Sequence, residues 1–139
     1  SDEGIGVRLV KILEETHAAA RSEVEFFDLG TGGMRVLHTV ANREKAVLID
    51  CAKMGSAPGT IRRFHPEDVR SIKQMPGFSL HEGDLMSIME LSQQLGEAPR
   101  ETVIFGIEPY SVAPGEGLSP ALQENVPNYV DTIAREIRE

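Results

Sequence analysis

The sequence predicts an α/β fold, a three-layer α/β/α sandwich built around a mostly parallel, twisted sheet. Short apolar runs that end in Gly or Asp alternate along the chain with segments whose apolar residues recur at helical spacing. Residues 46–49 are continuously apolar, which is typical of a strand buried on both faces of a parallel sheet. With 139 residues, 40% of them hydrophobic, the chain has the size and composition of a single domain, residues 1–139.

The first third of the chain predicts two helices and two strands. Apolar residues recur every three to four positions over 5–20, which predicts a helix. The short apolar run 24–29 predicts a strand that ends at Gly30, and a second helix is expected to begin at the next glycines and to run to residue 40. Residues 46–49 predict a buried strand with Asp50 at its carboxyl end.

The middle of the chain is richer in breaker residues. Glycines and a proline predict a loop over 52–59. Residues 60–64 predict an edge strand, and 65–68 a short helix or turn. Residues 70–82, which contain a Pro-Gly pair, are expected to be irregular.

The last third returns to regular elements. A helix is predicted over 84–95 and a buried strand over 102–107, followed by a Pro- and Gly-rich loop at 109–117. The final helix is expected to begin at Ser119, a capping residue followed by proline at the first helical position. Pro127 is expected to kink this helix or to split it in two.

The beginning of the chain departs from the expected pattern. A doubly wound domain usually opens with a strand, whereas this chain opens directly into a helix. We therefore expect that an initial strand and its glycine turn are missing from this chain.

Composition excludes several classes of function. The formal net charge of −8 and the aromatic content of 5% disfavour nucleic-acid binding, which needs basic and base-stacking surfaces. No apolar run approaches the roughly 20 residues of a membrane-spanning helix. The single cysteine, Cys51, excludes an internal disulfide and fits the reducing cytoplasm, where we expect it to be a small buried apolar residue.

Three residues that can bind metal stand at the ends of predicted elements: Glu3, Asp50 and His81. One imidazole and two carboxylates suit a divalent ion such as Ni²⁺ or Zn²⁺. Each residue also has a structural interpretation. Glu3 would stabilise a helix N-terminus, Asp50 would cap a turn, and His81 would lie on the surface. From the residues alone both interpretations stay open.

Six short motifs, spread in order over nearly the whole chain, resemble those of the [NiFe]-hydrogenase maturation proteases. They are Asp2-Glu3-Gly4-Ile5-Gly6-Val7-Arg8, Asp28-Leu29-Gly30-Thr31-Gly32-Gly33-Met34, Leu48-Ile49-Asp50-Cys51-Ala52, Pro58-Gly59-Thr60, Ser79-Leu80-His81-Glu82, and Phe105-Gly106-Ile107-Glu108-Pro109 with Gly117-Leu118-Ser119-Pro120. Members of that family normally begin with a short strand and a glycine turn ahead of the acidic pair, and this chain lacks both.

The resemblance implies roles for particular residues. Glu3, Asp50 and His81 would be the catalytic set that contacts the metal. The substrate-binding set would be Asp28, Gly30, Thr31 and Gly33. A glycine-rich turn needed only for its backbone freedom, with Asp28 as a turn residue, is the structural alternative.

The activity implied by the resemblance is that of an endopeptidase. It would remove the C-terminal extension of a [NiFe]-hydrogenase large-subunit precursor, with nickel supplied by that substrate and no tightly bound cofactor of its own. Two alternatives remain from the residues. One is a non-enzymatic flavodoxin-like binding module that uses the glycines at 30–33 to hold phosphate. The other is a hydrolase acting on peptidyl-tRNA, which the negative charge disfavours.

Overall fold

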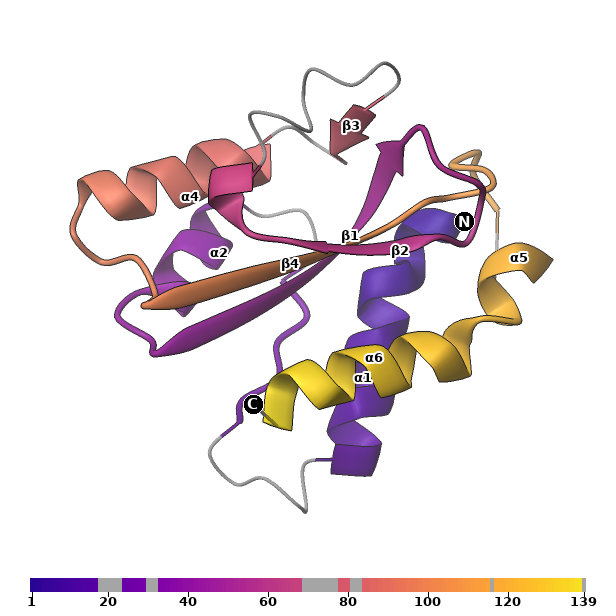
Figure 1. The fold of residues 1–139 in the computed structure, drawn as a ribbon, viewed down its shortest axis with the longest axis horizontal. Coiled ribbons are helices and arrows are strands. Elements are labelled where there is room, and N and C mark those ends of the chain that lie inside the picture. The colour runs from indigo at the N-terminus through magenta and orange to yellow at the C-terminus, as the bar shows by residue number, and fades with distance from the viewer. Residues whose placement is uncertain (18–23, 30–32, 69–77, 81–83, 116, 139) are drawn as a thin grey trace.

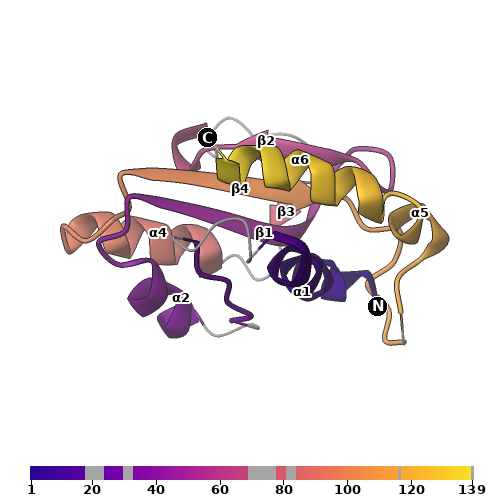
Figure 2. The same cartoon turned by 90° about the horizontal axis from the view of Figure 1, so that it is seen from below.

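The computed structural model describes residues 1–17, 24–29, 33–68, 78–80, 84–115 and 117–138. Within them, the sheet has the strand order β2-β4-β1-β3. Its strands are β1 (Lys45–Met54), β2 (Ile61–Phe64), β3 (Phe78–Leu80) and β4 (Glu101–Ile107). Figure 2 shows the sheet along its edge, with α6 on one side and α2 and α4 on the other. The α/β class is therefore confirmed.

Helices cover both faces of the sheet (Figure 1). They are η1 (Asp2–Gly4), α1 (Ile5–His17), α2 (Gly33–Val40), η2 (Pro66–Asp68), α4 (Asp84–Gln94), α5 (Pro120–Gln123) and α6 (Val126–Arg138). Of the helices that the structure describes, none combines the length and apolar character needed to cross a bilayer. The helix predicted over 5–20 is confirmed as far as His17, and its last residues lie outside the described part of the chain.

The centre of the sheet is parallel and both edges are antiparallel. β1 and β4 run in the same direction, with Lys45 opposite Glu101 and Cys51 opposite Ile107. β2 joins the outer edge of β4, and β3 joins the last three residues of β1, each in the antiparallel sense. Because the central pair is parallel, the carboxyl ends of β1 and β4 lie at one edge of the sheet.

Alternation along the strands produces a core on each face. On one face, buried residues of β4 pack against α1, α5 and α6, and Tyr129 of α6 is completely buried. On the other face, Ala52, Met54, Phe64 and Ile104 form a smaller cluster. Ala46 packs beside them with residues of α2 and α4.

The prediction of a strand over residues 24–29 is wrong. These residues form no strand and pair with none of the described strands, although the segment carries the expected apolar residues. A strand needs a neighbour to satisfy its backbone N–H and C=O groups. In the described part of the chain, β1 pairs with β4 and with β3, and neither ladder includes residues 24–29.

Two loop predictions were also wrong in part. Residues 52–54 belong to β1 rather than to the predicted loop 52–59, and residues 78–80 form β3 within the stretch predicted as irregular. The two errors have one cause, because these segments pair with each other and Ala52 lies opposite Leu80. Pairing between distant segments leaves no periodic signal in either one alone. Asp50 consequently lies within β1 rather than at its end.

The C-terminal helix is split, as predicted. α5 ends at Gln123 and α6 begins at Val126, so Pro127 lies in the first turn of α6, where a missing N–H costs nothing. Ser119 is the N-cap residue of α5, but its side chain makes no cap hydrogen bond.

Helix α6 is tied to the sheet by a buried carboxylate. Glu136 is only 6% exposed, and its two oxygens accept from Lys45 Nζ at 2.6 Å and from Arg63 Nε at 2.5 Å. The hydrogen bond from Arg63 is the main cause that lowers the pKa of Glu136 to about 2. Burial opposes this shift and Lys45 reinforces it. Because the folded-state pKa is lowered, the stabilisation is complete above the ordinary value near 4.5 and is lost as the pH falls towards 2.

Replacing Glu136 with Gln should therefore lower the free energy of unfolding by about 2 kcal/mol at pH 7, an estimate reduced for the half-exposed Arg63. The difference from the parent chain should shrink as the pH falls and vanish near pH 2. Urea unfolding at several pH values measures it. Glu101→Gln is the matched control, because Glu101 is 47% exposed and lies 3.6 Å from Lys45. Equal pH slopes for the parent and Glu136→Gln would contradict this account.

Candidate active site

The candidate site lies at the edge of the sheet where β1 and β4 approach their carboxyl ends. In open α/β sheets this is the edge where ligands bind. Asp50 of β1 lies opposite Gly106 of β4, and Glu108 follows β4 directly. The N-terminus reaches the same edge, because Ser1 donates from its amino group to the carbonyl oxygens of Gly115 and Gly117.

Close backbone packing brings Glu3 to this edge. Glu3 lies in η1, which contacts β1 and leads directly into α1. In the first turn of α1, a Cβ atom added to Gly6 would lie 2.9 Å from the carbonyl oxygen of Ile49, the residue before Asp50. Gly6 therefore lets the helix start lie against the backbone of β1, and Glu3 is placed three residues before this contact.

A methyl group at Gly6 should separate the two elements. We expect Gly6→Ala to lower the free energy of unfolding by about 1–2 kcal/mol, although alanine is the better helix former. Gly4→Ala is the matched control, since an added Cβ there meets nothing within 4 Å, and it should change stability by less than about 0.5 kcal/mol. Urea unfolding of both variants measures the difference. Equal stabilities would show that the contact is not tight.

Asp2 fastens the loop after β4 to the helix start. Its carboxylate is 1% exposed and accepts four hydrogen bonds of 2.7–3.0 Å, from the backbone N–H groups of Tyr110, Ser111 and Ser119 and from the Ser119 hydroxyl. Burial raises the pKa of Asp2, but the hydrogen bonds from Ser119, Ser111 and Tyr110 together outweigh burial and hold the pKa below its ordinary value. Asp2 is thus an ionised structural carboxylate next to Glu3.

Glu108 has a similar structural role on the other side of the edge. It is buried, and its Oε1 accepts from the backbone N–H groups of Met54 at 2.7 Å and Ser56 at 3.1 Å. Its own backbone N–H and C=O bond to Thr60 and Gly59. Glu108 therefore holds the turn between β1 and β2 in place, and its carboxylate is engaged inside the protein.

The pKa of the Cys51 thiol is raised by its burial and by the acidic groups around it. Burial is the largest cause that raises the pKa of Cys51 to about 12, and the negative charges of Asp50, Glu3, Asp2 and Glu108 contribute to the same rise. The contribution of Glu3 and Asp50 to this shift agrees with the contact of η1 with β1, which places both residues at the same end of the sheet. Cys51 is only 3% exposed, so it packs as the small apolar residue that the sequence predicts.

Two of the three predicted metal-contacting residues are thus brought to one edge, and the third lies outside the described residues. Within the part of the chain that the structure describes, no three His, Cys, Asp or Glu side chains are grouped so that they could hold a metal ion. Carboxylate oxygens from Glu3 and Asp50 are donors suited to a divalent ion, but two donors leave its coordination incomplete.

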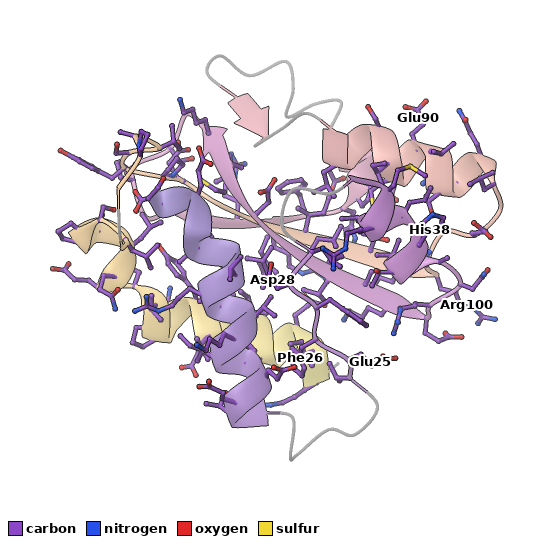
Figure 3. The ribbon with its side chains drawn as sticks, turned by 180° about the vertical axis from the view of Figure 1, so that it is seen from behind. Glu25, Phe26, Asp28, His38, Glu90 and Arg100 are labelled. Atoms are coloured by element: carbon purple, nitrogen blue, oxygen red, sulfur yellow. The ribbon has the colours of Figure 1, made fainter. Side chains whose placement is uncertain are left out.

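The predicted substrate-binding set is only partly described. Gly30 and Thr31 lie outside the described residues, and Gly33 is the first residue of α2. Asp28 is exposed on the segment that connects α1 to α2, which Figure 3 shows together with Glu25 and Phe26.

Asp2 and Glu108 are the site residues whose roles the sequence did not predict. Both appear in the quoted motifs, but neither was assigned a function. Glu108 could have been found by the rule that selected Asp50, because it too follows a buried apolar strand. For Asp2 no local signal exists, since its four donors lie 108 to 117 residues away.

Comparison with known proteins matches this chain to one family. The family model described as "Hydrogenase maturation protease" matches residues 7–136. Hydrogenase 2 maturation protease of Escherichia coli K12 is 30% identical over 140 residues, covering all of this chain and 84% of that protein. The solved structure of the hydrogenase maturating endopeptidase HybD from E. coli superimposes with a TM-score of 0.84 at 29% identity, covering 99% of this chain and 85% of that one.

Other relatives are considerably longer than this chain. The hydrogenase expression/formation protein HupD of Thiocapsa roseopersicina is 29% identical over 127 residues. The match covers 91% of this chain but only 57% of that protein.

Proposed function

Because the chain belongs to the hydrogenase maturation protease family, we propose that it is an endopeptidase that removes the C-terminal extension of a [NiFe]-hydrogenase large-subunit precursor. The observation that supports the proposal is the close approach of Gly6 to the Ile49 carbonyl, which packs the helix start that carries Glu3 against the residue before Asp50. The family match leaves no reason to retain the flavodoxin-like alternative.

We propose further that nickel arrives with the substrate rather than as a resident cofactor. Two carboxylates alone make a weak site, which suits transient contact with an ion already held by the precursor. His81 is the third member of the proposed set. The β1–β3 register supports it, because Leu80 lies opposite Ala52, two residues from Asp50, and His81 is the next residue after Leu80.

In this proposal the enzyme's residues act chiefly by positioning the precursor. Glu3 and Asp50 hold the precursor through its nickel, and this fixes the scissile peptide beside the carboxylates. Such positioning supplies a large part of a rate enhancement. The ion can polarise the peptide carbonyl or activate a water molecule. The loop held by Asp2 and the turn held by Glu108 keep the site rigid. We place the reaction in the cytoplasm, where Cys51 stays reduced.

The decisive experiment compares nickel-loaded and nickel-free precursor. We expect mass spectrometry to show loss of a C-terminal peptide only from the loaded precursor. His81→Ala should abolish the release of the C-terminal peptide with an unchanged circular dichroism spectrum, since His81 supplies the only imidazole of the proposed set. His38→Ala is the matched control, because His38 is exposed on α2, and it should process normally. Equal processing of both precursor forms would refute nickel dependence, and full activity of His81→Ala would remove His81 from the site.

A further inference from the structure

An exposed aromatic residue lies at the same edge of the sheet as the candidate site. Tyr110 is the third residue after β4, and it is 70% exposed, more than any other large apolar or aromatic residue that the structure describes. Figure 1 shows the N-terminus beside the loop that follows β4. Single exposed apolar residues are common on protein surfaces. The way in which Tyr110 is held therefore decides what it can do.

The backbone at Tyr110 is fixed by hydrogen bonds to Asp2. Asp2 Oδ2 accepts from the N–H groups of Tyr110 at 2.9 Å and of Ser111 at 3.0 Å, so two successive amides meet one buried carboxylate oxygen. The far end of the loop is held as well, because the Ser119 N–H donates to Asp2 Oδ1 at 2.7 Å. The exposed ring thus belongs to a backbone that is already ordered, and a binding partner need not order the loop first.

The same hydrogen bonds place Tyr110 next to the proposed catalytic carboxylates. Asp2 directly precedes Glu3, and both residues belong to η1. Val7, about one helical turn after Glu3, is 46% exposed and offers a second apolar side chain. The exposed Glu3 therefore has an aromatic residue fastened to the residue before it and a valine one turn after it. A substrate that reaches Glu3 would meet apolar surface beside it.

We propose that Tyr110 binds the precursor, and that its ring packs against an apolar side chain of the segment that the enzyme cleaves while Glu3 and Asp50 contact the nickel. This inference rests on the proposed function and adds the chemistry of the segment beside the metal. Tyrosine suits the role, because its ring supplies a large apolar surface, its hydroxyl can stay in water, and few rotatable bonds become fixed on binding. An acidic segment is disfavoured, since the carboxylates of this edge would repel it.

A second copy of this chain is the alternative occupant of this surface. Two copies would each carry a formal net charge of −8, and their mutual repulsion disfavours association through an edge that is itself acidic. The precursor is favoured because the surface is continuous with the proposed site, through the hydrogen bonds that join Tyr110 to Asp2.

Fluorine NMR tests the contact directly, because the chain contains only two tyrosines. When both are replaced biosynthetically with 3-fluorotyrosine, one signal comes from Tyr110. The other comes from Tyr129, which is completely buried and donates its hydroxyl to the Gly59 carbonyl oxygen. Tyr110→Phe assigns the two signals. Nickel-loaded precursor should shift the Tyr110 signal and reduce its solvent isotope shift between H₂O and D₂O, while the Tyr129 signal, the internal control, keeps its position.

Processing kinetics measure the contribution of the ring to binding. Tyr110→Ser should raise KM for nickel-loaded precursor about tenfold with little change in kcat, because the contact holds the substrate away from the reacting bond. Tyr110→Phe keeps the ring and should restore the low KM. Leu95→Ser is the matched control, since Leu95 is 54% exposed but directly follows α4, in the connection to the amino end of β4. If Tyr110→Ser does not fold, the fluorine measurement on the parent chain still decides.

The outcomes separate this inference from the proposed function. Processing by the parent chain with an unmoved Tyr110 signal, or with a parental KM in Tyr110→Ser, overturns the contact and leaves the proposed function standing. A shifted Tyr110 signal without release of a C-terminal peptide supports the contact and overturns the proposed cleavage. Absence of both effects overturns both. A Tyr110 signal that shifts with the concentration of the chain alone places the ring between two copies and also overturns the inference.

Discussion

Asp50→Asn should reduce removal of the precursor tail by at least about 100-fold while leaving the fold intact. Asparagine has the shape of aspartate but carries no charge, so it loses the affinity for a cation and the ability to accept a proton. β1 is held through its backbone, with Asp50 opposite Gly106 in the ladder with β4, and this pairing does not need the carboxylate. The pairing of β1 with β4 should therefore survive the substitution.

Mass spectrometry of nickel-loaded precursor measures the rate for Asp50→Asn, and urea unfolding checks its stability. Glu67→Gln is the matched control, since Glu67 is exposed in η2, which follows β2 at the opposite end of the sheet from Asp50. It loses the same single charge and should process at the parent rate. Parental activity in Asp50→Asn would exclude this carboxylate from the reaction.

Asp2→Ala should produce the largest loss of stability, about 3 kcal/mol, because it leaves three backbone N–H groups and a hydroxyl without their acceptor. The lowered pKa of Asp2 fixes the sign of the pH dependence. Its contribution is complete above the ordinary value of 3.8 and is lost as the pH falls through the lowered folded-state value. The Asp2→Ala chain should thus differ most from the parent at neutral pH.

Urea unfolding at several pH values measures that difference, and hydrogen exchange locates it. The amides of Tyr110, Ser111 and Ser119 should exchange faster in Asp2→Ala. Ser111→Ala is the control within the same loop, because the Ser111 hydroxyl is exposed and accepts a 3.2 Å bond from Ala113 N–H. It should cost less than about 0.5 kcal/mol. A loop that exchanges at the parental rate without Asp2 would show that Asp2 does not hold it.

The parts of the fold that could be predicted from the sequence are those governed by local pattern. Helical spacing predicted α1, and continuous apolar runs predicted β1 and β4. The errors occur where a distant partner decides the structure. Residues 78–80 are a strand because β1 pairs with them, and 24–29 is not a strand because none of the described strands pairs with it.

The candidate site likewise has some features that a local sequence pattern indicates and others that depend on distant segments. Glu3 and Asp50 could be proposed from the sequence, because Glu3 belongs to a family motif and Asp50 follows an apolar run, and their role in the site stays a prediction. Their proximity could not, because it depends on the contact between Gly6 and the Ile49 carbonyl, which joins two segments that are distant in sequence. Asp2 and Glu108 accept hydrogen bonds from backbone N–H groups of other segments. Every residue except proline carries such an N–H group, so no sequence pattern shows which of them a carboxylate will meet.

The burial of Cys51 has a practical consequence for reagents used with this protein. A thiol that is 3% exposed and has a pKa raised to about 12 holds almost no thiolate at neutral pH, and thiolate is the form that alkylating agents attack. Brief treatment with iodoacetamide should therefore leave this chain unlabelled. If such treatment stops the tail removal proposed above, the modified cysteines belong to the precursor, and alkylation becomes a means of probing the substrate in a mixture of the two proteins.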